Sequence, residues 1–67
     1  MGSEARMTNA VASARLTRGW TQQRLASVTQ VSRQTIIAIE KGDYEPSTSL
    51  SLKLALALGV AVEDLFA

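Results

Sequence analysis

Residues 21–40, TQQRLASVTQVSRQTIIAIE, decide the fold, because their pattern predicts two short helices joined by a tight turn at 29–32. Apolar positions recur at helical spacing on an inward face, and these positions are Leu25, Ala26, Val31, Ile36 and Ile39. Thr21 and Ser32 each stand just before a helical stretch, where a hydroxyl can accept a hydrogen bond from an unpaired backbone N–H. Both helix starts are therefore marked, and the small side chain of Ala26 lets the two helices cross closely.

The outward face of the second helix has a composition that is unusual for a solvated surface. With Ile36 and Ile39 inside, the 3.6-residue period places five residues opposite them: Arg33, Gln34, Ile37, Ala38 and Lys41. None of the five is acidic, whereas an exposed helix usually shows acids and bases together. Arginine pairs with guanine, glutamine with adenine, and small apolar groups contact the thymine methyl, so this face suits a DNA major groove. The alternative is a solvated face with Ile37 in a dimer or crystal contact.

Several motifs along the chain are highly specific when their order and spacing are taken together. They are Arg15, GWTQ at 19–22, LA at 25–26, VSRQTI at 31–36, IEKG at 39–42, YEPS at 44–47 and LALALGV at 54–60. From about Asn9 to its last residue the chain resembles the phage-repressor or Cro-type helix-turn-helix domains, the xenobiotic-response-element family of bacterial regulators. The resemblance implies an all-α, compact five-helix lambda-repressor-like DNA-binding domain.

The resemblance also implies roles for individual residues. In that family, residues at the positions of Arg15 and Glu40 form a buried ion pair between the first helix and the DNA-contacting helix; the alternative is a solvated pair. Glutamine at the position of Gln22 clamps a phosphate, which the first turn of a helix favours. We expect phosphate contacts from Gln22, Arg24, Ser32, Lys41 and Tyr44. For Tyr44, burial of the ring in the core is the alternative.

The turn departs from the family pattern at Gln30. Many relatives have glycine or asparagine there, because the residue often adopts a positive φ. A glutamine at this position either costs about 1 kcal/mol or belongs to a slightly altered turn. Trp20, which follows a predicted helix stop at Gly19, is assigned to the core rather than to base stacking.

Further helices are predicted on both sides of the central pair. The first starts at Thr8 or Asn9, either of which can cap it, and a short last helix at 62–66 lacks a good cap. The helix at 48–58 is apolar almost all round, so it needs cover on two sides. We therefore expect a two-fold dimer surface made by Leu56, Val60, Val62 and Phe66, suited to palindromic half-sites.

Length and composition limit the remaining possibilities. A chain of 67 residues makes one domain, and its 46% apolar but 4% aromatic composition favours helices. Without cysteine or histidine, disulfides, imidazole catalysis and the usual zinc clusters are excluded, so we expect no metal and no cofactor. No apolar run approaches the roughly 20 residues that span a bilayer, and we expect a cytoplasmic protein with no membrane contact.

Charge is distributed unevenly along the chain. Residues 1–41 hold six bases and two acids, a net +4, whereas residues 42–67 hold one base and four acids, a net −3. A basic half that faces DNA and an acidic half that points away would orient the molecule toward phosphate. Residues 1–6 are set apart as a cloning remnant or a disordered start, and 7–67 are assigned to the helix-turn-helix DNA-binding domain.

These features predict a sequence-specific transcriptional regulator, a repressor, that binds double-stranded DNA as a homodimer. Base contacts are expected from Arg33, Gln34, Ile37 and Ala38. The alternative is an antitoxin or protein-interaction module that uses the same fold to bind a partner protein through its apolar fourth helix. We predict no catalysis: Glu63 and Asp64 are adjacent, so they do not share a helix face, and no nucleophile or metal ligand accompanies them.

Overall fold

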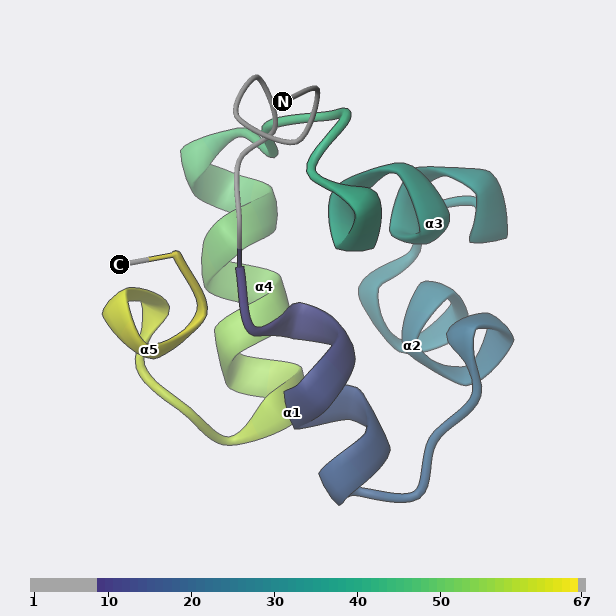
Figure 1. The fold of residues 1–67 in the computed structure, drawn as a ribbon, viewed down its shortest axis with the longest axis horizontal. Coiled ribbons are helices and arrows are strands. Elements are labelled where there is room, and N and C mark those ends of the chain that lie inside the picture. The colour runs from purple at the N-terminus through teal and green to yellow at the C-terminus, as the bar shows by residue number, and fades with distance from the viewer. Residues whose placement is uncertain (1–8, 67) are drawn as a thin grey trace, which may run out of the picture.

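The computed structural model describes residues 9–66, and its elements are all helices (Figure 1). They are α1 (Val11–Thr17), α2 (Gln22–Thr29), α3 (Arg33–Lys41), α4 (Thr48–Leu58) and α5 (Val62–Phe66). The all-α, five-helix prediction is therefore confirmed. Thr8 as a cap and the division between 1–6 and 7–67 lie outside the described residues.

The helices pack around α4, which contacts α1, α2 and α5. The pair α2 and α3 lies to one side of α4 and α5 to the other, as Figure 1 shows. Between them is one core whose members are at most 5% exposed: Val11, Leu25, Ala26, Ile36, Ile39, Leu54, Ala55, Leu58 and Leu65. Val31 and Trp20 are half-buried and pack against this core. The inward face predicted for the central helix pair is thus the face that the structure buries.

Hydroxyl groups cap the three central helices at their N-termini. The side chains of Thr21, Ser32 and Ser47 accept hydrogen bonds of 3.0 to 3.1 Å from the backbone N–H three residues later. Each bond satisfies a backbone donor that has no partner within its own helix. The starts of α2, α3 and α4 are therefore fixed by local sequence.

The two outer helices have no hydroxyl cap at their N-termini. The N-cap residue of α1 is Ala10, one residue after the predicted Asn9, and it makes no side-chain cap bond. Asn9 accepts a hydrogen bond from the Val11 N–H at 3.1 Å and donates to the Ile39 carbonyl at 2.8 Å. It therefore ties the start of α1 to the last turns of α3. At α5, the Asp64 carboxylate accepts a hydrogen bond from the Ala61 N–H at 3.2 Å, which is the reciprocal half of a capping box.

The turn between α2 and α3 begins one residue later than predicted. Thr29, predicted as part of the turn, is the last residue of α2. It is 1% exposed, and its hydroxyl donates to the Leu25 carbonyl at 2.7 Å, so its polar group is satisfied inside the helix. Gln30 then adopts the left-handed conformation, with φ 62° and ψ 39°. The turn keeps the positive φ typical of the family despite having no glycine there.

Candidate nucleic-acid interface

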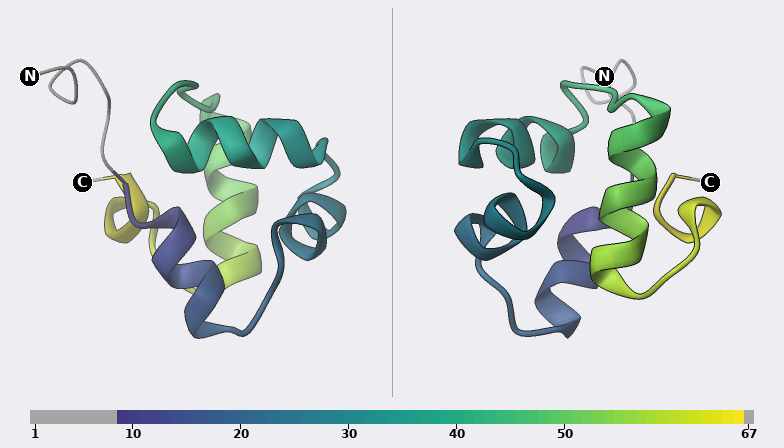
Figure 2. Two further views of the ribbon diagram at one scale, coloured as in Figure 1. Left: turned by 45° about the vertical axis from the view of Figure 1, so that its right-hand side comes forward. Right: turned by 180° about the vertical axis from the view of Figure 1, so that it is seen from behind.

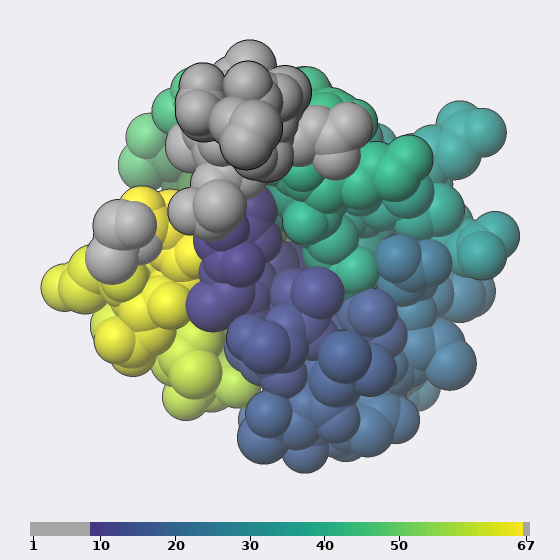
Figure 3. All heavy atoms as spheres, viewed as in Figure 1, coloured from purple at the N-terminus to yellow at the C-terminus, as the bar shows by residue number. Residues whose placement is uncertain are grey.

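The outer face of α3 is available for contact, and its inner face is not. Ile36 and Ile39 are fully buried, while Arg33, Gln34 and Lys41 are exposed. Ile37 and Ala38 lie between these extremes and are half-buried. In Figure 3 the teal side chains of α3 protrude beside blue α2, at the opposite edge from yellow α5. Two cations and an amide therefore project around a small apolar strip.

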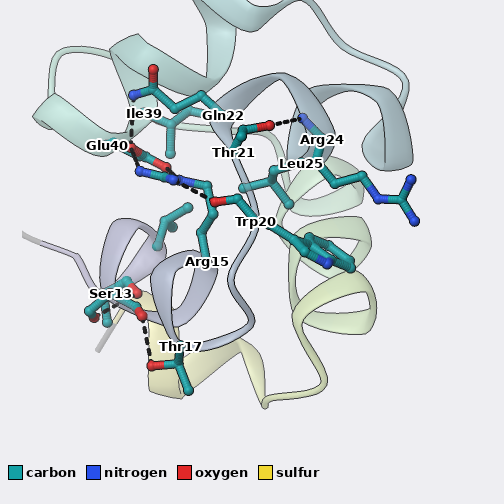
Figure 4. A network of polar contacts seen from close by, with 12 residues as sticks. Ser13, Arg15, Thr17, Trp20, Thr21, Gln22, Arg24, Leu25, Ile39 and Glu40 are labelled. Atoms are coloured by element: carbon teal, nitrogen blue, oxygen red, sulfur yellow. Dashed lines mark hydrogen bonds and ion pairs between the residues drawn. The ribbon is translucent and has the colours of Figure 1, made fainter.

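The only acid of α3, Glu40, is turned away from this face and held by Arg15 of α1 (Figure 4). Arg15 Nε lies 2.7 Å from Glu40 Oε2, and Arg15 Nη2 lies 3.2 Å from Oε1. Arg15 Nη1 also donates to the Trp20 carbonyl at 2.7 Å. The two side chains are only 11% and 8% exposed, so the contact that the resemblance implied is present and the solvated alternative is wrong. The carboxylate is paired with a cation, and α3 presents only positive charge outward.

Gln22, at the first position of α2, belongs to the same network. Its Nε2 donates to Glu40 Oε1 at 3.1 Å, a contact that sequence reasoning missed. A carboxylate has more acceptor sites than one arginine fills, which was the available signal for a further donor. The contact fixes which end of the amide faces Glu40. Gln22 keeps a second N–H, which can donate to a group outside the domain.

The ring of Trp20, next to the start of α2, is in contact with two arginines. The guanidinium carbons of Arg18 and Arg24 are 4.9 and 5.6 Å from the centre of its ring. This distance range is that of cation–π attraction. Arg18 also donates to the Leu58 carbonyl at 3.4 Å and so links α1 to the end of α4. The ring is therefore occupied by core and arginine contacts, in keeping with the core assignment of Trp20, while the exposed Arg24 adds positive charge beside Gln22.

The remaining phosphate-contact candidates differ in how they are held. Ser32 is exposed, but its hydroxyl accepts the Thr35 N–H at 3.1 Å and lies 2.9 Å from the Thr35 hydroxyl. Lys41 is exposed in the last turn of α3. Tyr44 is 48% exposed in the loop that follows, so its ring is not part of the core. The exposed Glu45 in that loop opposes phosphate contact locally.

A family comparison fits this geometry. The model of the helix-turn-helix family matches residues 11–65, which run from the first residue of α1 to the penultimate residue of α5. The chain belongs to the helix-turn-helix family. The Cro-type resemblance carried by the sequence motifs is thereby confirmed, and the family is one of transcriptional regulators that bind DNA.

Relatives of this helix-turn-helix domain are found in archaea and bacteria. An uncharacterised HTH-type transcriptional regulator of Methanocaldococcus jannaschii is 59% identical over 46 residues, which cover 69% of this chain and 70% of the relative. The uncharacterised HTH-type transcriptional regulator YgzD of Bacillus subtilis is 45% identical over 60 residues, covering 90% and 91% of the two chains.

Solved structures share the fold. The restriction-modification controller protein C.AhdI of Aeromonas hydrophila superposes with a TM-score of 0.76 at 28% identity, over 81% of this chain and 82% of that one. A hypothetical transcription factor, NHTF, from Neisseria gives a TM-score of 0.78 at 32% identity, over 85% of this chain and 66% of its own length.

The four residues expected at a dimer surface are not equally accessible in this helix-turn-helix domain. Leu56 is 83% exposed. The other three, Val60, Val62 and Phe66, are half-buried against the core of their own chain. Accessible apolar surface is instead found at Leu52 and Val28, which are 51% and 43% exposed.

Other classes of site find no support within residues 9–66. No cluster of three acidic, histidine or cysteine side chains in this range is arranged to hold a metal ion. No helix in the described part of the chain has the length and apolar character needed to cross a membrane.

Proposed function

We propose that this chain is a sequence-specific transcriptional regulator, a repressor, that binds double-stranded DNA as a homodimer with α3 in the major groove. The outward face of α3 carries the proposal. Its acid is sequestered by Arg15, and its exposed positions hold two cations and an amide. This combination matches the donors and acceptors on base edges.

Base contacts are assigned to the face of α3 that lies opposite its buried isoleucines. Arg33 would donate to the O6 and N7 atoms of guanine, and Gln34 would pair with adenine. Ile37 and Ala38, which are half-buried, would contact thymine methyl groups. We assign no catalytic step to these residues.

Phosphate contacts are assigned to residues that border this face: Gln22, Arg24, Ser32, Lys41 and Tyr44. Gln22 and Arg24 stand in the first turn of α2, where free N–H groups and the helix dipole favour an anion. Lys41 would add a contact at the other end of α3. Such contacts set the position of the protein on the duplex without selecting its sequence.

The homodimer is proposed because helix-turn-helix dimers bind two half-sites about one helical turn apart. The names of the relatives support the regulator over the alternative of an antitoxin or protein-interaction module. Two of them are named HTH-type transcriptional regulators, and a structural relative is named a controller protein.

Selection from random duplex DNA tests the proposal. We expect enrichment of a short motif in two inverted copies, with centres about 10 base pairs or a multiple of that spacing apart. The matched control is the variant Arg33→Ala/Gln34→Ala, which keeps the buried face of α3 and should lose the motif. Selection that enriched no motif for the unaltered protein, or the same motif for both proteins, would overturn the assignment of α3.

A further inference from the structure

The buried pair of Arg15 and Glu40 contacts the start of α2 at two points. Arg15 Nη1 donates to the carbonyl of Trp20, two residues before the helix, at 2.7 Å. Glu40 Oε1 accepts a hydrogen bond from Nε2 of Gln22, the first residue of the helix, at 3.1 Å. The loop that leads into α2 runs along the edge of the molecule (Figure 2, left), and Figure 4 shows both contacts at the end of this loop. One ion pair therefore holds both the backbone and a side chain where α2 begins.

The second contact decides how the amide of Gln22 is oriented. A carboxylate only accepts hydrogen bonds, so Glu40 selects the NH₂ end of the amide and turns its carbonyl oxygen away, as Figure 4 shows. Glu40 is itself fixed, because Arg15 donates to both of its oxygens, at 2.7 and 3.2 Å. Nε2 carries two N–H groups, and the contact with Glu40 uses one of them. The other N–H is left at the half-buried start of α2, on an amide that is held in place.

We propose that Glu40 is a positioning residue for DNA binding: clamped by Arg15, it holds the Gln22 amide so that the remaining N–H can donate to a backbone phosphate. The inference rests on the proposed phosphate contact of Gln22 and specifies how that contact is prepared. A glutamine side chain that is already immobilised loses less conformational entropy when the phosphate binds. The contact is therefore stronger than one made by a freely rotating glutamine.

The charge balance of the network suits a site next to phosphate. An unpaired carboxylate there would repel the phosphate, but Glu40 is compensated by the guanidinium of Arg15, which is only 11% exposed. Gln22 stands between this pair and the anion as an uncharged donor to both. A buried ion pair is often no more stabilising than apolar residues of similar volume. Orientation of Gln22 gives the pair a use that stability alone does not.

A thermodynamic cycle on DNA binding tests the positioning, because a purely structural pair would not change what Gln22 contributes. Gln22→Met removes the amide and keeps the length of the side chain. In the unaltered protein we expect it to raise the dissociation constant for the selected duplex about tenfold, the effect of losing one hydrogen bond to a charged group. In the background Arg15→Met/Glu40→Leu, which lacks the pair, Gln22→Met should raise it less than about threefold. A duplex of unrelated sequence should show the same coupling, since phosphate contacts do not depend on sequence.

Arg33→Ala is the matched control, because Arg33 is the first residue of α3 and Glu40 stands in its last turn. Its effect on the selected duplex should be the same in both backgrounds, which would show that removal of the pair leaves α3 in place. Circular dichroism at the temperature of the binding measurement should show every variant folded. Equal effects of Gln22→Met in the two backgrounds, or an effect of Arg33→Ala that also disappears without the pair, would overturn the positioning.

A measurement on the unaltered protein without DNA tests the orientation independently of any variant. NMR relaxation of the side-chain amides should give a high order parameter for Nε2 of Gln22 and a low one for Nε2 of the exposed Gln34. This difference is expected because Glu40 holds the first amide before any phosphate is present. A Gln22 amide as mobile as that of Gln34 would contradict the positioning, even if the background without the pair did not fold.

The outcomes separate this inference from the proposed function. If Gln22→Met had no effect while Arg33→Ala weakened binding to the selected duplex, the positioning would be wrong and the base contacts of α3 would stand. If the coupling appeared on an unrelated duplex and the protein enriched no motif, the positioning would be supported and the sequence-specific assignment of α3 would be wrong.

Discussion

The guanidinium group of Arg15 donates to both carboxylate oxygens of Glu40, at 2.7 and 3.2 Å, and so joins α1 to the end of α3. Both side chains are about nine-tenths buried, at 11% and 8% exposure. The desolvation of two charges offsets much of their attraction, so the intact pair adds little to the stability of the fold. Removal of one partner, in contrast, is strongly destabilising. The remaining charge would then be buried without an opposite charge beside it.

Replacing Arg15 with methionine should lower the free energy of unfolding by about 3 to 5 kcal/mol, because Glu40 keeps its charge and loses its main donor. Urea unfolding followed by circular dichroism measures the loss. The double variant Arg15→Met/Glu40→Leu removes both charges and should recover much of the stability. A loss below about 1 kcal/mol in the single variant is the behaviour of a solvated pair and would contradict the prediction.

The turn offers a substitution that should stabilise the domain. Gln30 has a positive φ of 62°, which glycine adopts without the clash of a Cβ atom. We expect Gln30→Gly to raise the free energy of unfolding by up to about 1 kcal/mol, since the greater freedom of glycine in the unfolded chain offsets part of the gain.

The same principle gives a control of opposite sign at Gly59. There φ is +71°, and an added Cβ would lie 3.3 Å from Nη1 of Arg18. Gly59→Ala should therefore destabilise the domain in the same urea titration. A stability loss on Gln30→Gly would contradict the prediction, because the relief of backbone strain would then be smaller than the cost of the freedom that glycine has in the unfolded chain.

The fold was predictable because its signals are local. A hydroxyl before α2, α3 and α4 marks each start, and the apolar period identifies Ile36 and Ile39 as buried. The sequence analysis placed Thr29 in the turn, whereas Thr29 is the last residue of α2. It stands directly before the turn, and the hydrogen bond from its hydroxyl to the Leu25 carbonyl could not be inferred from the sequence. Family resemblance, not pattern, supplied the Arg15–Glu40 contact.

The candidate site was less predictable where it depends on how helices cross. The hydrogen bond from Gln22 to Glu40 joins residues 18 apart in sequence, on two helices whose angle sets whether the side chains meet. Which leucines of α4 are exposed also depends on how the helices cross. Its leucines look equivalent in sequence, yet Leu54 and Leu58 are buried, while Leu52 and Leu56 are exposed, because α1, α2 and α5 cover only part of the helix.

Two serine caps allow stability to be separated from DNA binding. Ser32 and Ser47 each accept a backbone N–H at 3.1 Å, at the starts of α3 and α4. Ser32→Ala and Ser47→Ala should each cost about 1 kcal/mol of unfolding free energy. Only Ser32→Ala should also weaken binding to the selected duplex, because Ser32 borders the proposed contact face. Equal binding losses would show that both act through stability alone.

Base contacts and phosphate contacts should respond differently to substitution on α3. Arg33→Ala should cost about 1 to 3 kcal/mol of binding free energy on the selected site and relax the preference at one base position. Lys41→Ala should weaken binding to all duplexes alike and reduce the salt slope by about 1. Fluorescence anisotropy with the selected duplex and single-base variants measures both. Unchanged affinity of Arg33→Ala for the selected site would remove Arg33 from the base contacts.

Gln22 and Arg24 permit the same kind of separation within α2. An amide donates to phosphate without releasing a counterion, whereas a guanidinium releases one. Gln22→Ala should therefore weaken binding to every duplex with the salt slope unchanged, and Arg24→Ala should lower the slope by about 1. Arg24 also lies over Trp20, so Arg24→Gln, which keeps a polar side chain, controls for altered packing. If Arg24→Ala and Arg24→Gln both left the slope unchanged, Arg24 would contact the Trp20 ring rather than DNA, and α2 would hold phosphate through Gln22 and its backbone N–H groups.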